Sequence, residues 1–475
     1  MKLINKIIIS ILLLILSIII YMFKYNLQFK VWLINIILVS RGLITTNCKW
    51  FKISDIILGD DASGVNLYNS YKKKYGDFAE TNMFGKKINV VTKNEYIKTI
   101  LDNSPDLFNV GKIKQTFFRT FMSKNVGVSS GCPWKSRRQM NEFALDSDKL
   151  HQFASKYNDD INKELIKRKN EKSIKYDDFN ELSKLMAAKI VFNTDKLDDD
   201  VFKIFSEANT TEVFHNPNFK IDPEIHKKYM KILNQHIDNP NEKSLVKLCV
   251  DSLKSANNIK CPSIKDNRDE IIHQIPHFIF PIIVIFVRVI PLVLLLLCNH
   301  PKAFKKVVDE IYSLNQGTNQ NYGNPEDISK KIYKLTFLRK CILESLRLNN
   351  PLTTTFRTLE KDYTFDDKYS FKKGEQFLIL HNPVLREKEF FEEPNKFIPT
   401  RWTNEMEKSY YAISFGQGPQ RCPGKELVIY ISQCFIYNLV VIKNIGRTTS
   451  ILSNNVDTQN IPQVFNPCNA KFQFM

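Results

Sequence analysis

Glycine and proline are scarce in this sequence, with 15 and 19 among 475 residues. This scarcity excludes a collagen-like or mucin-like chain. Apolar residues make up 43% and charged residues 25%, so a mostly disordered chain is excluded and a large core is possible. The length allows two or three average domains or one large helical domain. We find no internal repeat.

No two of the nine cysteines form a C-x-x-C pair. The sequence therefore argues against a zinc ribbon or a thioredoxin-like site. Their density is also too low for a disulfide framework. We therefore expect reduced, mostly buried thiols in a domain that faces the cytosol.

The chain has an excess of positive charge, with 68 Lys and Arg against 50 Asp and Glu and a net charge of +18. Such a balance suits a membrane surface, an acidic protein or nucleic acid as partner. The charge is spread in small clusters, such as residues 72–74 and 137–138, and no long basic tail is present. Nucleic acid is thus the least favoured of the three, and we expect no nucleic-acid partner.

The amino terminus predicts a membrane anchor. Residues 7–23 are nearly all apolar and are flanked by lysines, which fits a short spanning helix. A cleaved signal peptide is the alternative, but no small-x-small site follows the run. Residues 31–40 are typical of an interfacial helix, and the basic residues between positions 24 and 52 favour a cytosolic main body. We expect an anchor segment at residues 1–45 and one main domain at residues 46–475.

A second apolar run extends from residue 275 to residue 298. Its hydropathy would suit another spanning helix, but it contains His277, Arg288, Pro281 and Pro291. A helix that is apolar all round also occurs at the centre of a large domain. We favour the central helix because of the motifs that follow it.

The rest of the chain mixes helical patterns with short strands. Residues 79–91 predict a hairpin, residues 357–380 predict strands, and residues 257–268 predict a loop. Helices are predicted at residues 302–313 and 329–348, within 93–207, and at 427–441, where the apolar pattern indicates a buried helix.

The first motif with chemical meaning is a glycine-framed cysteine at Phe415-Gly-Gln-Gly418-Pro-Gln-Arg-Cys422-Pro-Gly424. Gly418 and Gly424 permit tight turns and close approach of the backbone to a flat ligand. A helix that begins after Gly424 would place its positive end near the sulfur, and backbone N–H groups would tune that sulfur. Phe415 would shield it from water. The alternative is a structural cysteine on a glycine-rich turn.

A second motif supplies charges that would hold this loop. Glu344 and Arg347 are one helical turn apart and can pair, although such pairs are usually solvated. Arg401 offers a second guanidinium. A buried carboxylate held by two planar donors would lock the loop that carries Cys422.

Together these motifs resemble the cytochrome P450 family of haem-thiolate monooxygenases, over about residues 60–450 in the expected order. The matching positions are Phe415, Gly418, Cys422 and Gly424 in the haem-binding loop, Glu344, Arg347 and Arg401 in the E-x-x-R triad, and Trp134, Arg138 and Arg357 among the haem-contacting residues. The resemblance implies a mainly α fold with small β-sheets (α+β).

The resemblance also implies a cofactor and partners. Cys422 would ligate the iron of haem b (iron protoporphyrin IX), and Trp134, Arg138 and Arg357 would bind its propionates. A flavoprotein NADPH reductase would supply electrons at a basic face near Lys135, Arg421 and Lys425. The substrate would be a lipophilic small molecule, and the location would be a membrane of endoplasmic-reticulum type.

Two departures from the family pattern affect this expectation. Gln420 stands where the family has an Arg or His against a propionate. The acid and alcohol of the family's central helix, which deliver protons for oxygen activation, fall on Val284 and Ile285, and the neighbouring glycine falls on Ile282. We therefore expect impaired or unconventional oxygen activation and a kink at Pro281. An O2-independent isomerase, dehydratase or peroxygenase, and a non-catalytic haem protein, remain as alternatives.

Overall fold

The computed structural model describes residues 65–83, 86–208, 219–255, 261–264, 267–314, 325–453, 468 and 470–475. The predicted anchor at residues 7–23, the interfacial segment at 31–40 and the tip of the hairpin at 84–85 lie outside these residues. The described chain is mainly helical and its sheets are small, as the sequence predicts.

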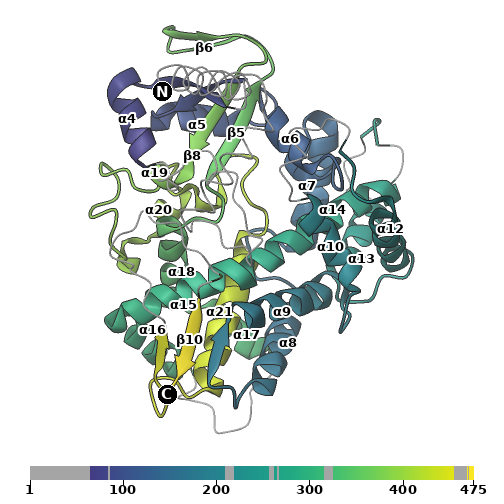
Figure 1. Ribbon diagram of the computed structural model, residues 1–475, viewed down its shortest axis with the longest axis vertical. Coiled ribbons are helices and arrows are strands. Elements are labelled where there is room, and N and C mark those ends of the chain that lie inside the picture. The colour runs from purple at the N-terminus through teal and green to yellow at the C-terminus, as the bar shows by residue number, and fades with distance from the viewer. Residues whose placement is uncertain are drawn as a thin grey trace, which may run out of the picture.

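Five short strands form the main sheet, which lies with α4 (Val65–Tyr75) and α5 (Asn94–Asp102) at one end of the molecule (Figure 1). The strands are, in spatial order, β1 (Phe78–Met83), β2 (Lys86–Val91), β8 (Gln376–Leu380), β5 (Thr354–Leu359) and β3 (Phe108–Asn109). Neighbours are antiparallel except β2 and β8. Apolar side chains of the strands, such as Val91 and Phe377, pack against Ile97 and Ile100 of α5. The predicted hairpin at 79–91 and the predicted strands at 357–380 are confirmed.

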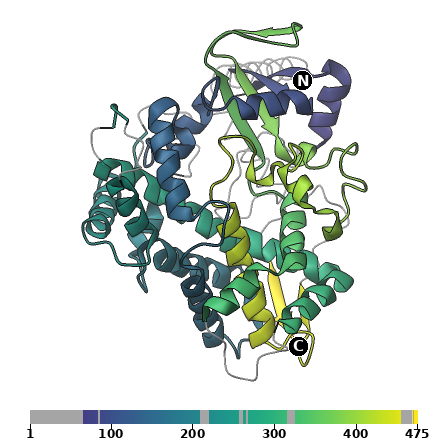
Figure 2. The ribbon, with the colours of Figure 1, turned by 180° about the vertical axis from the view of Figure 1, so that it is seen from behind.

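Two smaller β-structures complete the fold. The strands β6 (Tyr363–Phe365) and β7 (Tyr369–Phe371) form a hairpin. A three-stranded sheet joins β4 (Ser173–Lys175), β10 (Lys471–Phe474) and β9 (Ile451–Ser453) at the end of the molecule opposite the main sheet (Figures 1 and 2). The carboxyl terminus is therefore paired with a strand that lies about 300 positions earlier in the chain.

The other helices pack around one long apolar run. They are α6 (Lys112–Phe118), α7 (Gly131–Leu145), α8 (Ala154–Lys167), α9 (Tyr176–Ala187), α10 (Asp199–Ala208), α12 (Pro223–Asp238), α13 (Leu245–Lys254), α16 (Pro301–Ser313), α17 (Pro325–Tyr333), α18 (Thr336–Leu348), the short α19 (His381–Val384) and α20 (Asn404–Lys408), and α21 (Lys425–Ile442). Short turns of 3-10 or π helix lie between them, at η1 (Val126–Val128), η2 (Ala188–Phe192), η4 (Pro399–Arg401) and η5 (Ile413–Phe415). The single helix predicted at residues 329–348 is divided between α17 and α18.

The apolar run at residues 275–298 crosses the middle of the molecule (Figure 1), within α14 (Asn267–Val284), η3 (Ile285–Val289) and α15 (Ile290–Asn299). Two helical stretches of the described chain, this one and α21, are long and apolar enough to cross a membrane. The apolar windows of both are mostly buried inside the protein, 83% and 78% respectively, which supports the central-helix interpretation.

The irregular turn of this run lies after Pro281, in η3. α14 continues through Pro281, and the helix widens into a π turn only at η3. Pro291 is the second residue after η3. It has no N–H to donate to the carbonyl of Val287, which lies inside η3. A wider turn lets such a carbonyl reach the next N–H along the chain, which is the i→i+5 pattern of a π turn.

The expectation of reduced cysteines is wrong at three positions. Cys132 and Cys261 form a disulfide, and Cys468 is also disulfide-bonded. Cys132 and Cys261 are 129 positions apart in sequence but have Cα atoms only 5.6 Å apart, because α7 packs against the segment before α14. Sequence spacing cannot reveal such a pair. The buried thiols of Cys249 and Cys434 are free, as expected.

Candidate functional site

The cysteine loop, residues 415–424, turns sharply between η5 and α21. Gly416 and Gly418 both have positive φ, +70° and +73°, and the N–H of Cys422 donates to the carbonyl of Phe415 at 2.8 Å. A side chain at Gly418 would collide with the backbone of Leu101, at the end of α5. Gly418 therefore permits a close approach, as predicted, but one of the protein's own backbone. Gly424 has φ −96°, which other residues adopt readily.

The sulfur of Cys422 lies in a mixed electrostatic environment. Burial raises the pKa of the Cys422 thiol, while the N–H of Gly424 and the cationic side chains of Arg138, Lys425 and Arg421 lower it. α21 begins at Lys425, so its positive end lies beside the cysteine, as the sequence suggested. A cavity of about 490 Å³ also reaches Cys422 and Phe415.

The structure brings the carboxylate of Glu344 and the guanidinium groups of Arg347 and Arg401 together. Glu344 and Arg347 are fully buried, and two hydrogen bonds of 2.9 Å join them in a bidentate pair. The Nε of Arg401 donates to the same carboxylate at 3.1 Å. The indole N–H of Trp402 donates to it at 2.9 Å, and the backbone N–H of Ile398 donates to it at 3.0 Å. The role of Trp402 is missed at the sequence level, although the residue directly follows Arg401.

This buried network holds the segments around the cysteine loop. The Nη1 of Arg347 donates to the carbonyls of Leu385 and Pro394, at 2.9 and 2.7 Å. Just after α18, the amide of Asn350 donates to the carbonyl of Ser414 at 3.1 Å, one residue before Phe415. The chain that leads into the turn is thus fixed by side chains from α18 or its end.

Three further candidate residues come from α7 and β5. Arg138 is 7% exposed and donates to the carbonyl of Arg421 at 2.6 Å, so α7 contacts the cysteine loop directly. Trp134 lies one turn earlier on α7 and is half-buried. Arg357 is 8% exposed, and its Nε and Nη1 donate to Ser104 and to the Phe356 carbonyl. Burial lowers the pKa of Arg357 to about 10.

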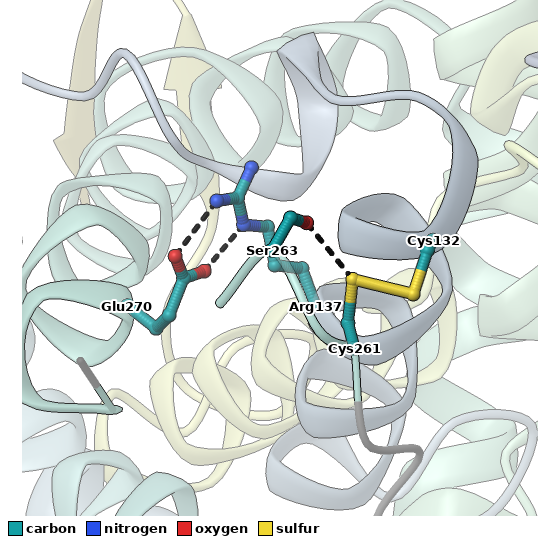
Figure 3. Close-up of a disulfide and its surroundings, with 5 residues drawn as sticks. All are labelled: Cys132, Arg137, Cys261, Ser263 and Glu270. Atoms are coloured by element: carbon teal, nitrogen blue, oxygen red, sulfur yellow. Dashed lines mark hydrogen bonds and ion pairs between the residues drawn. A yellow bond between two sulfur atoms is a disulfide. The ribbon is translucent and has the colours of Figure 1, made fainter. Parts of the chain in front are cut away.

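α7 is cross-linked to the start of the central helix (Figure 3). The Arg137 guanidinium forms a bidentate pair with Glu270, with a 2.7 Å contact between Nη2 and Oε1. The disulfide of Cys132 lies one helical turn away and includes Cys261, whose sulfur is 3.0 Å from the Ser263 hydroxyl. Arg137 is therefore held by a buried carboxylate and is largely removed from solvent.

The central helix presents an apolar surface at the acid and alcohol positions. Ile282 and Ile285 are 3% and 2% exposed, and Val284 is half-buried. The T-shaped contact of Phe286 with Phe435, with ring centroids 6.0 Å apart, packs η3 against α21. None of these side chains can carry a proton.

A sequence profile described as cytochrome P450 matches residues 50–440. The chain belongs to the cytochrome P450 family. Members of this family bind haem through a cysteine thiolate, and the mainly helical fold with small sheets agrees with the family.

Curated relatives match shorter stretches. The chain is 30% identical over 142 residues to (21S)-21-acetyl-1-hydroxy-apo-melianone synthase of Melia azedarach. The matched stretch covers 29% of this chain and 28% of that protein. It is 34% identical over 109 residues to beta-amyrin 28-monooxygenase of Solanum lycopersicum, 23% of each chain. It is 31% identical over 103 residues to C-22 sterol desaturase of Candida albicans, 21% of this chain and 20% of that protein. The chain thus spans about a quarter of the length of these relatives.

The residues present fit a haem group. Among the described residues no cluster of three or more His, Cys, Asp or Glu side chains could hold a bare metal ion, whereas a porphyrin leaves only axial positions to the protein. Arg357 is buried and forms no ion pair with a described carboxylate. A buried cation without an anion is unfavourable, so a ligand that brings carboxylates suits this site.

Proposed function

We propose that this protein is a haem-thiolate monooxygenase of a lipophilic substrate, with Cys422 as the axial ligand of haem b. The observation that carries the proposal is the cysteine loop itself. It is pressed against the α5 backbone at Gly418, joined to α7 through Arg138, and fixed through the Glu344 network. The haem, when bound, supplies the chemistry of oxygen activation.

The chain's own residues hold and shield the group. Arg138 and Arg357 are the cationic donors for the propionates, and the indole N–H of Trp134 is a third donor, since it forms no hydrogen bond with a described residue. Phe415 packs against the main core and covers the loop side of the sulfur. Glu344 neutralises Arg347 and Arg401 and so keeps the loop rigid.

The ligand assignment is tested by the spectrum of the reduced, CO-bound protein. Wild type should show the thiolate-type Soret band, and Cys422→Ser should lose it. Cys434→Ser is the matched control, because Cys434 is a buried free thiol that lies three turns further along α21. Persistence of the band in Cys422→Ser would sink the assignment.

A peroxygenase-type reaction is the second candidate, favoured by the apolar central helix. With Val284 and Ile285 at the acid and alcohol positions, we expect poor coupling of NADPH use to product and better turnover with peroxide or an oxygenated lipid. The double variant Val284→Asp/Ile285→Thr should raise the yield of product per NADPH. Efficient, well-coupled hydroxylation by the wild-type enzyme would contradict this candidate.

Electrons would come from a flavoprotein NADPH reductase at the basic face near the cysteine loop. Two of the three expected basic residues already have carboxylate partners, since Arg421 pairs with Asp148 at 2.5 Å and Lys425 with Glu407 at 2.7 Å. Lys135 is exposed and forms no ion pair with a described residue. We therefore expect Lys135→Glu to raise the KM for the reductase more than it changes kcat. An equal effect of Lys135→Met and Lys135→Glu would argue against a charge contact.

The membrane part of the proposal rests on residues 1–45, with a spanning helix at 7–23 and the catalytic domain at 46–475 on the cytosolic face of an endoplasmic-reticulum-type membrane. A glycosylation tag fused after Met475 should stay unmodified. Glycosylation of that tag would reverse the proposed topology.

A further inference from the structure

Lys114 on α6 is a cation that no described residue neutralises. The side chain is half-buried and forms no hydrogen bond or ion pair with a described residue. Burial and the nearby guanidinium of Arg357 lower the pKa of Lys114 to about 8. The start of α6 also lies against β5, because a Cβ built on Gly111 would be 3.5 Å from the backbone nitrogen of Arg357. Two cations, one on α6 and one on β5, are therefore neighbours, and neither forms an ion pair with a described carboxylate.

Lys114 also lies beside the central helix. A Cβ built on Gly127 of η1 would be 3.2 Å from the Nζ of Lys114 and 3.6 Å from the Cε1 of His277. The side chains of α6 and α14 thus approach the backbone at Gly127, where the Oδ1 of Asn125 lies nearer still, 2.9 Å from the same Cβ position. Burial, followed by the charges of Lys114 and Arg138, lowers the pKa of His277 to about 4, so its imidazole is neutral at neutral pH.

The charges that act on His277 are those of Lys114 and Arg138. Arg138 has the carboxylate of Glu142 at 2.7 Å, and the side chain of Glu142 is 42% exposed. The Nη2 of Arg357 makes no hydrogen bond with a described residue.

A singly charged, planar acceptor fits these donors best. An ammonium group and one free guanidinium nitrogen match the two oxygens of a carboxylate, and the neutral imidazole can add one more hydrogen bond. A phosphate monoester has three terminal oxygens, so at least one of them would lack a cationic donor of its own here. The site is therefore suited to a carboxylate.

We propose that Lys114, together with Arg357, binds a carboxylate group beside Gly127 and His277. This inference rests on the proposed haem-thiolate function. The carboxylate has two possible sources, a propionate of the haem or the acid group of a lipophilic substrate.

The test uses the full-length, haem-loaded protein as wild type, Lys114→Met, Lys114→Arg and Lys302→Met. Lys302 is an exposed lysine on α16 and controls for the loss of one positive charge. One arm measures the rate of haem transfer to excess apomyoglobin. The other measures spectral titrations with hexadecanoic acid and with hexadecanol. The thiolate Soret band of each preparation is recorded first, so a failure of the haem-thiolate function is seen in wild type before any variant is compared.

Loss of one charge-assisted hydrogen bond should weaken binding of the carboxylate group by roughly tenfold to hundredfold. Haem loss faster by about that factor in Lys114→Met, restored by Lys114→Arg, identifies a propionate. A similar loss of the preference for acid over alcohol, with haem transfer unchanged, identifies a substrate carboxylate. If Lys114→Met matches Lys302→Met in both arms, the proposal is overturned.

Discussion

Replacing Gly418 by alanine is a direct probe of the packing that positions Cys422. Gly418 has φ +73°, and a Cβ there would lie 2.7 Å from the carbonyl carbon of Leu101 and 3.2 Å from the nitrogen of Asp102, besides contacting the Leu101 oxygen. These are backbone atoms, so no side-chain rotation can relieve the collision. The left-handed conformation costs alanine about 1–2 kcal/mol. Forcing the backbone apart costs a further ~1–3 kcal/mol by analogy with overpacked cores.

The same loop provides a matched control. Gly416 has nearly the same φ, +70°, but the nearest atom to its Cβ is the Cα of Arg421 at 3.7 Å, which is ordinary contact. Gly416→Ala should therefore lose only the conformational part, about 1–3 kcal/mol, because ψ of 174° places Gly416 in a region that glycine occupies almost alone. Urea unfolding followed by circular dichroism, together with the haem content of each variant, measures the difference. Equal destabilisation of the two variants would refute the argued contact between the cysteine loop and α5.

Two further predictions concern the cross-links that support the site. Glu344→Gln should lower the free energy of unfolding by about 3–5 kcal/mol, because it leaves two buried guanidinium groups without a counter-charge; a urea midpoint close to that of wild type would contradict the network. Cys132→Ser should cost about 2–5 kcal/mol, because it removes a cross-link that closes a long loop. Dithiothreitol should remove the difference between the urea midpoints of wild type and Cys132→Ser, because reduction at Cys468 affects both proteins alike. Equal midpoints of the two proteins without the reductant would show that the Cys132–Cys261 disulfide adds nothing.

Several features of the fold could be predicted because their signals are local. The hairpin at residues 79–91 shows its alternating pattern within one short window, and the apolar run at 275–298 is visible from composition alone. Its length and hydropathy alone could not place it at the centre of the domain, because they fit a membrane-spanning helix equally well. The short polar flanks of the run and the motifs after it decided the matter, and 83% burial agrees.

Features that join distant segments could not be predicted. Arg137 and Glu270 are 133 positions apart, and nothing in either local sequence indicates the other. The same holds for Cys132 and Cys261. Because their pairing cannot be read from the sequence, the prediction that these cysteines are reduced was wrong. The sequence indicated that the backbone at Gly418 approaches another group closely. It could not indicate that this group is the backbone of Leu101, because Leu101 lies 317 positions earlier in the chain.

The two sides of the site differ in what the chain supplies. Around Cys422 it supplies cations, a locked carboxylate network and a helix amino terminus. On the central helix it supplies Ile282 and Ile285, which are buried and cannot transfer protons. The first set is adapted to holding an anionic, flat cofactor, and the second removes proton transfer from the protein's side chains at those two positions. We therefore expect turnover to depend on protons from water or from the substrate's own hydroxyl group, so that an oxygenated lipid should be a better substrate than its deoxy analogue.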